Sequence, residues 1–372
     1  MDFTSKALQE LEAKRSNLSS KFGIVGLDGF VDTIVSPVDS RYGTGEDFTT
    51  IPQIEEFASR IGAAAGKSTN IEIYPRVQKL GGNGPILANA LREAGSKIRY
   101  IGALGKPQIH PVFADFAKQT EAVSLAEPGQ TTALEFEDGK IMLGQTSSLE
   151  EVTYPAIIQA IGEGAFFDMV SRTDLVALVN WTMIPAMTDI FNALLDKVLP
   201  NLDTSRQRTF FFDLADPEKR SDSDIKSALL TIKKFQSFGR CVLGLNFKEA
   251  QSVARILGTE PGDRDEKNLT RLCAGIRQEL AIHTVVVHPT ESAACATRED
   301  SWFVPGPYCP KPRITTGAGD HFNAGFLSGM LMGLSPQSCL VSGVATSGFY
   351  VRQARSPSLN ALDHFIRNWP SS

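Results

Sequence analysis

A run of small residues that ends in an acid holds the side chains best suited to do chemistry: Thr315-Thr316-Gly317-Ala318-Gly319-Asp320. Apolar residues at helical spacing follow this run, which predicts a helix that begins there. Backbone N–H groups crowded at the start of a helix form a site for an anion such as a phosphate. A carboxylate beside that site would repel the anion, so Asp320 is expected to take a proton from an attacking hydroxyl. The plainer alternative is an ordinary loop with an Asp in the first turn of a helix.

A second polar pair follows the apolar run Cys241–Leu245, which predicts a buried strand. Asn246 and Glu249 would then stand at the carboxyl end of that strand, where open α/β sheets bind ligands. An amide and a carboxylate at this spacing could hold water ligands of a Mg²⁺ ion that bridges nucleotide phosphates. The same pair also fits a helix N-cap with its capping-box acid. Taken alone, the residue types favour the cap.

A glycine turn, Gly81-Gly82-Asn83-Gly84, precedes the predicted helix Pro85–Ala94. Paired glycines let the backbone approach a ligand closely, and the Asn83 amide can both donate to and accept from hydroxyl groups. The alternative is a plain turn with proline at the start of a helix. Another glycine stretch, residues 62–68, misses the P-loop spacing by one residue and follows a helical pattern, which favours a simple helix end.

Apolar runs alternate with amphipathic stretches along the chain, which predicts a mostly parallel sheet covered by helices on both faces. The predicted strands are Gly23–Leu27, Ile98–Ile101, Leu175–Val179, Thr209–Asp213, Cys241–Leu245 and Thr284–Val287. The predicted helices are Pro85–Ala94, Pro185–Leu199, Ser223–Phe238, Lys248–Leu257, Asn268–Leu280 and residues 51–65, 319–332, 336–352 and 360–368. Two features break this alternation: a hairpin formed by Thr131–Phe136 and Lys140–Leu143, and a strand at Ile71–Val77. They predict a small antiparallel sheet, which would be either a lid or a projecting β-sheet without mobility.

Composition narrows the functional class. The chain has 372 residues and a net charge of −5, which argues against a general nucleic-acid binder. It contains no apolar run long enough for a membrane span and no signal-peptide pattern at its start. Five cysteines without a C-x-x-C pair fit free thiols in a reducing compartment, so a cytoplasmic protein is expected.

The string T-T-G-A-G-D-x-F-x-A-G-F resembles the second signature of the ribokinase-like (PfkB) carbohydrate kinase family. The unit that starts at Gly81 resembles the first signature, and Asn246 to Glu249 matches the N-x-x-E motif of the family. The resemblance spans roughly residues 23–365, with the motifs in the family order. It implies a ribokinase-like three-layer α/β sandwich, formed as one domain over residues 1–372, with lid elements within 33–80 and 123–147.

The resemblance also implies roles for individual residues. Asp320 would be the catalytic base, and the amides of Gly317, Ala318 and Gly319 would form the anion hole. ATP would contact Thr316 and His288, and Mg²⁺ would be held through water by Asn246 and Glu249; with the motif match, this metal role ranks above the cap. The sugar would lie against Gly81, Gly82 and Asn83 and against a carboxylate after the first strand, Asp32 as first choice and Asp28 as second. At least one of these two acids is expected to cap a turn instead.

Three departures from the family pattern bear on the substrate and cofactors. Ile86 stands where the family has a common sugar-binding Asn, which leaves room for a nucleoside or a vitamin alcohol as acceptor. Ile314 replaces an Asp that helps bind potassium in many relatives, which puts a monovalent-cation requirement in doubt. The turn after Thr284–Val287 begins at His288 and lacks the usual glycines, so a differently shaped nucleotide pocket is expected.

The sequence therefore predicts an ATP- and Mg²⁺-dependent kinase that phosphorylates a hydroxyl of a sugar-like small molecule. The resemblance implies in addition a homodimer contact through the lid, as in many members of the family. Within the same fold, a nucleoside or vitamin-alcohol kinase and a non-catalytic ligand-binding relative remain the alternatives. A nicotinamide dehydrogenase is the least expected, because no G-x-G-x-x-G follows the first strand.

Overall fold

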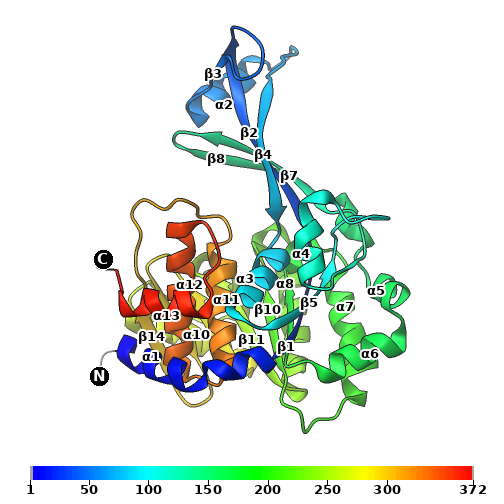
Figure 1. Ribbon diagram of the computed structural model, residues 1–372, viewed down its shortest axis with the longest axis vertical. Coiled ribbons are helices and arrows are strands. Elements are labelled where there is room, and N and C mark those ends of the chain that lie inside the picture. Colours follow the sequence, from blue (N-terminus) through cyan, green and yellow to red (C-terminus); the bar gives the residue numbers. More distant parts are fainter. Residues whose placement is uncertain (1–2, 371–372) are drawn as a thin grey trace.

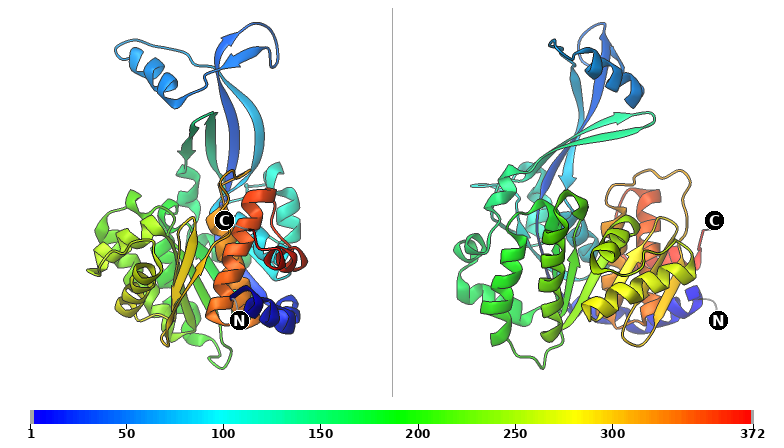
Figure 2. Two further views of the ribbon diagram at one scale, coloured as in Figure 1. Left: turned by 90° about the vertical axis from the view of Figure 1, so that its left-hand side faces the viewer. Right: turned by 180° about the vertical axis from the view of Figure 1, so that it is seen from behind.

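A nine-stranded sheet forms the body of the molecule, and helices cover both of its faces (Figures 1 and 2). The computed structural model describes residues 3–370. The strands follow the order β14-β13-β12-β11-β10-β9-β1-β5-β6, and neighbours are parallel from β6 to β12. Their bounds are β1 Phe22–Leu27, β5 Lys97–Gly102, β6 Val123–Ser124, β9 Leu175–Val179, β10 Thr209–Asp213, β11 Arg240–Asn246, β12 Thr284–His288, β13 Ser292–Ala296 and β14 Ser301–Pro305.

Side chains that alternate along the parallel strands supply two separate cores, because successive residues of a strand point to opposite faces of a sheet. In β10, Phe210 and Phe212 pack into one core, whereas Phe211 packs into the other. Burial on both faces explains why these strands appear in the sequence as continuous apolar runs.

Helices of the two outer layers come from different parts of the chain. One layer contains α1 Phe3–Lys14, α3 Asn83–Ala94, α4 Ala114–Gln119, α11 Ala318–Met332, α12 Pro336–Gln353 and α13 Leu359–Arg367. The other contains α5 Tyr154–Ile161, α6 Glu163–Arg172, α7 Met187–Ala193, α8 Asp222–Lys234, α9 Phe247–Leu257 and α10 Glu266–Leu280. The predicted three-layer α/β sandwich is confirmed.

A small five-stranded sheet stands away from this body (Figure 1). It consists of β2 Phe30–Arg41, β3 Phe48–Thr50, β4 Ile73–Gly81, β7 Gly129–Phe136 and β8 Gly139–Gln145, with α2 Ile54–Ala63 against it. It has a core of its own, built from Val35, Ile51, Phe57 and Leu134. The predicted hairpin is confirmed as β7 and β8, and both segments expected to supply lid elements contribute to this sheet.

Some predicted helices differ in extent from the observed ones. Over the predicted Ser223–Phe238, α8 ends at Lys234 and a 3₁₀ turn, Phe235–Ser237, follows. The sequence predicts an α-helix over Pro185–Leu199, but α7 ends at Ala193 and a π-helical turn, Leu194–Val198, follows it. Leu194, Leu195 and Val198 are all buried. All three pack into the core that α5 to α10 cover, and a single π-helical turn is the usual form in which such a bulge interrupts an α-helix.

Two further expectations are met. Residues 62–68 lie at and beyond the end of α2, far from the sheet edge, so the P-loop-like string is a helix end. All five cysteines are free thiols, four of them buried. Within residues 3–370, none of the helices combines the length and the hydropathy needed to cross a lipid bilayer.

Candidate active site

Five parallel strands deliver polar side chains to one edge of the main sheet. The residues that end these strands or directly follow them are Asp28, Asn180, Asp213, Asn246 and His288. A cavity of about 710 Å³ opens over this edge. Its lining includes the sequence-predicted residues Asp32, Gly82, Asn83, Asn246, Glu249, His288, Thr316, Gly317, Ala318, Gly319 and Asp320, but neither Asp28 nor Gly81.

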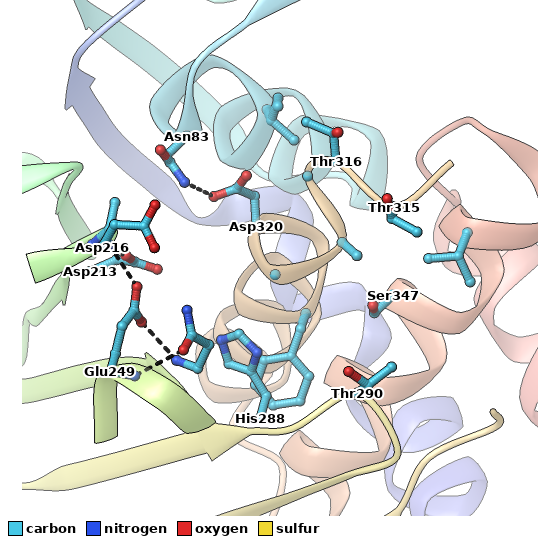
Figure 3. A pocket seen from close by; sticks show the side chains of 18 of the residues that line it. Asn83, Asp213, Asp216, Glu249, His288, Thr290, Thr315, Thr316, Asp320 and Ser347 are labelled. Atoms are coloured by element: carbon cyan, nitrogen blue, oxygen red, sulfur yellow. Dashed lines mark hydrogen bonds between the residues drawn. The ribbon is translucent and has the colours of Figure 1, made fainter. Parts of the chain in front are cut away.

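Asp320 lies in the first turn of α11, as predicted, and points into the cavity (Figure 3). Helix α11 starts at this point because Gly317 takes a left-handed conformation, with φ of 84°. The carboxylate is 7% exposed, and Asn83 Nδ2 donates to its Oδ1 over 3.0 Å. Burial raises the pKa of Asp320 to about 8; the charges of Asp28 and Glu249 act in the same direction, and the Asn83 hydrogen bond opposes them.

The predicted anion loop is only partly free to bind. The Ala318 amide already donates to the Thr315 carbonyl over 3.1 Å. The amides of Gly317 and Gly319 have no backbone acceptor among the described residues. A Cβ atom on Gly319 would lie 3.2 Å from the His288 ring, so a glycine allows the close approach of loop and ring. Of the three amides predicted to form an anion hole, those of Gly317 and Gly319 are therefore free to bind, whereas that of Ala318 is engaged.

Asp28 does not reach the cavity. Its fully buried carboxylate accepts hydrogen bonds from the Asn83 amide at 2.9 Å, the Gly84 amide at 2.8 Å and Asn180 Nδ2 at 2.6 Å. Burial raises the pKa of Asp28 to about 6, against the effect of these bonds. Asp28 thus takes the turn-capping role and holds the start of α3, which corrects its ranking as second choice for a sugar ligand.

Asp32 does line the cavity, from strand β2. Its carboxylate rests on Gly81, where a Cβ atom would come within 2.4 Å of it. Burial raises the pKa of Asp32, while a hydrogen bond from Thr131 and the charges of Lys79 and Lys140 act in the opposite direction. Gly81 therefore supplies space for the acid rather than a contact of its own in the cavity.

Asn246 and Glu249 form the capping box at the start of α9. The Asn246 side chain accepts from the Glu249 amide at 3.0 Å, and Glu249 accepts from the Asn246 amide at 2.8 Å. The second oxygen of Glu249 accepts from the Asp216 amide at 2.9 Å, in a turn where Ala215 and Asp216 are both left-handed. Asn246 and Glu249 therefore cap α9, and each oxygen of the Glu249 carboxylate keeps a further lone pair that could accept a hydrogen bond from water.

Asp213 is a site residue that the sequence reasoning missed. It ends β10, lines the cavity, accepts from Asn323 Nδ2 at 2.8 Å and is 8% exposed. Burial raises its pKa, and the charges of Glu249 and Asp320 raise it further. The signal was available, because an acid that ends a predicted buried strand of a parallel sheet must lie at the ligand-binding edge. Among residues 3–370, no three His, Cys, Asp or Glu side chains are placed to hold a metal ion directly.

His288 separates the acidic part of the cavity from a less polar slot. Its ring packs against Phe322 with centroids 4.6 Å apart, and burial lowers its pKa to about 4, so it is neutral. Its Nε2 is buried and has no hydrogen-bond partner among the described residues. Beyond it, the glycine-free turn after β12 contributes to the slot, which is lined by Pro289, Thr290, Pro307, Val344, Ser347 and Val351.

His321, also missed, supports the loop from behind. Its Nδ1 contacts the Gly317 carbonyl at 2.7 Å, and its Nε2 contacts Ser356 Oγ at 2.9 Å. The ring stacks on Tyr350 with centroids 3.5 Å apart, and the Tyr350 hydroxyl donates to the Thr316 carbonyl at 2.9 Å. Burial lowers the pKa of His321 to about 4. A neutral ring with both nitrogens engaged fixes the carbonyl that faces away from the anion hole.

Comparisons with known proteins identify the family of this chain. The family model for prokaryotic ketohexokinase matches residues 4–369. A ketohexokinase of Haloferax volcanii is 26% identical over 348 residues, which cover 93% of this chain and 91% of that protein.

Solved structures support the same fold. Arabidopsis thaliana ribokinase, solved with ribose and ATP, is 14% identical and has a TM-score of 0.65, with 93% of this chain and 98% of the other covered. A Methanocaldococcus jannaschii nucleoside kinase is 14% identical and has a TM-score of 0.61, with 94% and 98% covered. At such identity these two show the fold alone. The chain belongs to the prokaryotic ketohexokinase family, and it is a ribokinase-like carbohydrate kinase.

Proposed function

We propose that this carbohydrate kinase transfers the γ-phosphoryl group of ATP to a hydroxyl of a ketohexose, with Asp320 as the base. The observation that carries the proposal is the placement of a buried carboxylate in the first turn of α11, next to the free glycine amides and held by Asn83. A pKa of about 8 makes Asp320 a strong enough base to accept a hydroxyl proton near neutral pH.

The transfer needs one proton acceptor and one anion site. The acceptor oxygen forms a bond to the γ-phosphorus, the bond from that phosphorus to the β,γ-bridging oxygen breaks, and the hydroxyl proton passes to Asp320. The amides of Gly317 and Gly319 stabilise the charge on the transferring group, and losing one such donor typically costs about 10²–10³ in rate. Asn83 keeps the Asp320 carboxylate turned toward the acceptor.

The sugar would bind at the end of the cavity bounded by Asp32, Asn83 and Ile86. A buried carboxylate accepts two hydroxyl hydrogen bonds, and Asn83 has an amide oxygen left for a third. The family membership and the relative named ketohexokinase favour a ketohexose. The apolar side chain of Ile86, which packs against Gly317, favours a nucleoside or vitamin alcohol as the second candidate.

ATP would occupy the other half of the cavity, with its base in the slot beyond His288 and its phosphates near Thr316. The pKa values of Asp213, Glu249 and Asp320 are raised partly by one another or by nearby acids, a surplus of negative charge that suits a divalent cation. Bound Mg²⁺ would neutralise the nucleotide phosphates, and Asn246 and Glu249, with Asp213, would hold its water ligands. The small sheet would act as the lid that excludes water from this site.

Phosphorylation of a panel of sugars tests the proposal. Purified protein with ATP and Mg²⁺ is expected to phosphorylate ketohexoses faster than aldoses, nucleosides or vitamin alcohols. Asp320→Asn should lower kcat by about 10²–10⁴-fold while nucleotide binding is kept. A preference for nucleosides would establish the second candidate, and an Asp320→Asn variant with near wild-type turnover would remove the assigned base.

A further inference from the structure

Lys140 joins the small sheet to the anion loop. It is the second residue of β8, next to the hairpin turn, and its Nζ donates to Thr316 Oγ1 over 2.7 Å. The hairpin tip itself is anchored within the small sheet, because the Ile54 amide donates to Asp138 at 3.1 Å. The long, flexible side chain of Lys140 therefore extends from an anchored hairpin to Thr316, the residue that precedes Gly317.

The ammonium group of Lys140 lies between the two halves of the site. Its charge and that of Lys79 counteract the burial of Asp32, the acid assigned to the sugar, so Lys140 is within electrostatic reach of that carboxylate. Its hydrogen bond places it equally at the loop assigned to the phosphates. Among the described residues, neither lysine takes part in an ion pair.

The strand register shows that this placement follows from the fold. Lys140, Met142 and Gly144 alternate along β8 and so share one face of the small sheet. Met142 and Gly144 line the active-site cavity. Asp32 lies on the same face, since it pairs with Thr131, and Thr131 pairs with Gly144. The face that carries Lys140 therefore overlooks the site.

We propose that Lys140 is a catalytic residue of the phosphoryl transfer, a cation that the small sheet brings to the transferring group. With both substrates bound, its Nζ shifts from Thr316 Oγ1 to a γ-phosphoryl oxygen at the junction of acceptor and donor. The bonds made and broken are those of the proposed reaction, and Lys140 keeps its protons. The negative charge that spreads over the phosphoryl oxygens during transfer is thereby met by a positive charge.

The rival explanation is a tether, in which Lys140 only holds the small sheet near the body. The two explanations differ in which kinetic constant changes. Loss of a tether weakens the binding of substrates and raises their KM values. Loss of a charge that acts in the transition state lowers kcat and leaves binding nearly unchanged.

Lys140→Met, which keeps the length of the side chain without its charge, tests the proposal, which rests on the proposed function. We expect kcat to fall by about 10²-fold or more, with KM for sugar and ATP changed less than about fivefold. Lys140→Arg should recover part of the loss. Lys67→Met removes an exposed lysine in the loop that follows α2 and should behave as wild type. Lys79→Met removes the other charge near Asp32 and should lower kcat much less than Lys140→Met.

A second measurement tests whether the loss of the Lys140 charge, rather than a change in the fold, causes the loss of activity. ADP, Mg²⁺, sugar and aluminium fluoride, a mimic of the transferring group, should raise the Tm of the wild type and of Lys67→Met well above the value with ADP and sugar alone. Lys140→Met should lose this extra rise and keep the shift caused by ADP. A kcat within about threefold of wild type, or a change confined to KM, would overturn the proposal.

Failure of the proposed acceptor can be told apart from failure of the role of Lys140. If the wild type phosphorylates no sugar in the panel, the acceptor assignment is wrong. The role of Lys140 is then tested by the rate of the slow transfer of the γ-phosphoryl group of ATP to water. Lys140→Met should reduce this rate by a similar factor, and Lys67→Met should not.

Discussion

At the scale of single residues, the state of Asp320 sets the pH dependence. A base must be deprotonated to act, and the pKa of Asp320 is raised to about 8 in the absence of ligands. We therefore predict that kcat/KM for the sugar falls about tenfold per pH unit below pH 8. A profile that stays flat down to pH 5 would rule out Asp320 as the titrating base.

The buried charge of Asp320 should also lower the free energy of unfolding. Its folded pKa of about 8 lies above its ordinary value of 3.8, so its unfavourable contribution appears as pH rises from about 4 and is complete above about 8. Asp320→Asn keeps an oxygen for Asn83 and removes the charge. We predict a higher Tm than wild type at pH 9, on the order of 1–3 kcal/mol of added stability, and no difference near pH 4. Thermal unfolding at the two pH values without ligands checks this.

The two N-terminal acids should behave in opposite ways. Asp32→Ala removes the proposed ligand of the sugar and should raise the KM for sugar about ten- to hundredfold, with little change in the KM for ATP. Asp28→Ala leaves three N–H donors, two of them buried, without their acceptor and should cost at least about 3 kcal/mol of stability. Steady-state kinetics and thermal unfolding of both variants distinguish these outcomes. A stable Asp28→Ala protein with a raised KM for sugar would reverse the assignment.

At the scale of elements, the start of α9 combines a cap with an expected metal contact, and two substitutions separate them. Asn246→Ser keeps a capping oxygen for the Glu249 amide, whereas Asn246→Ala removes it at a cost of about 0.5–2 kcal/mol. We predict that both variants need more Mg²⁺ for half-maximal activity, because both lose the amide, but that only the Ala variant loses stability. Unchanged Mg²⁺ dependence in both would leave Asn246 with the cap alone.

Parallel strands made the main sheet, and the edge at which its cavity opens, predictable from sequence. Leu175–Val179 and Thr209–Asp213 were placed to the residue, because strands buried on both faces leave uninterrupted apolar runs. Strands β13 and β14 were not predicted, since short, mixed segments carry little pattern. The choice between Asp28 and Asp32 could be ranked but not settled from sequence, because it depends on which carboxylate meets the amides of a turn fifty residues away.

At the scale of the whole molecule, the small sheet exposes apolar side chains that a monomer leaves uncovered. Val77, Ile34, Ala133 and Met142 are direct partners across four neighbouring strands and therefore form one row on one face. Val77 is 48% exposed and Met142 is 45% exposed. The row lies on the face that carries Asp32 and Lys140, between these two residues in the strand register. A partner that covered it would hold that face in place over the cavity.

We predict that a second copy of the chain covers this row, so that light scattering on the purified protein gives about twice 40.4 kDa. Val77→Asp puts a charge at one end of the apolar row, where burying it without a partner is costly, and should give the mass of a single chain. Its kcat should also fall, because the small sheet then loses support. Leu230→Asp changes an equally exposed apolar residue on α8, away from the small sheet, and should leave both mass and activity unchanged. A wild type with the mass of one chain, or a Val77→Asp variant that stays paired, would contradict a dimer through this face.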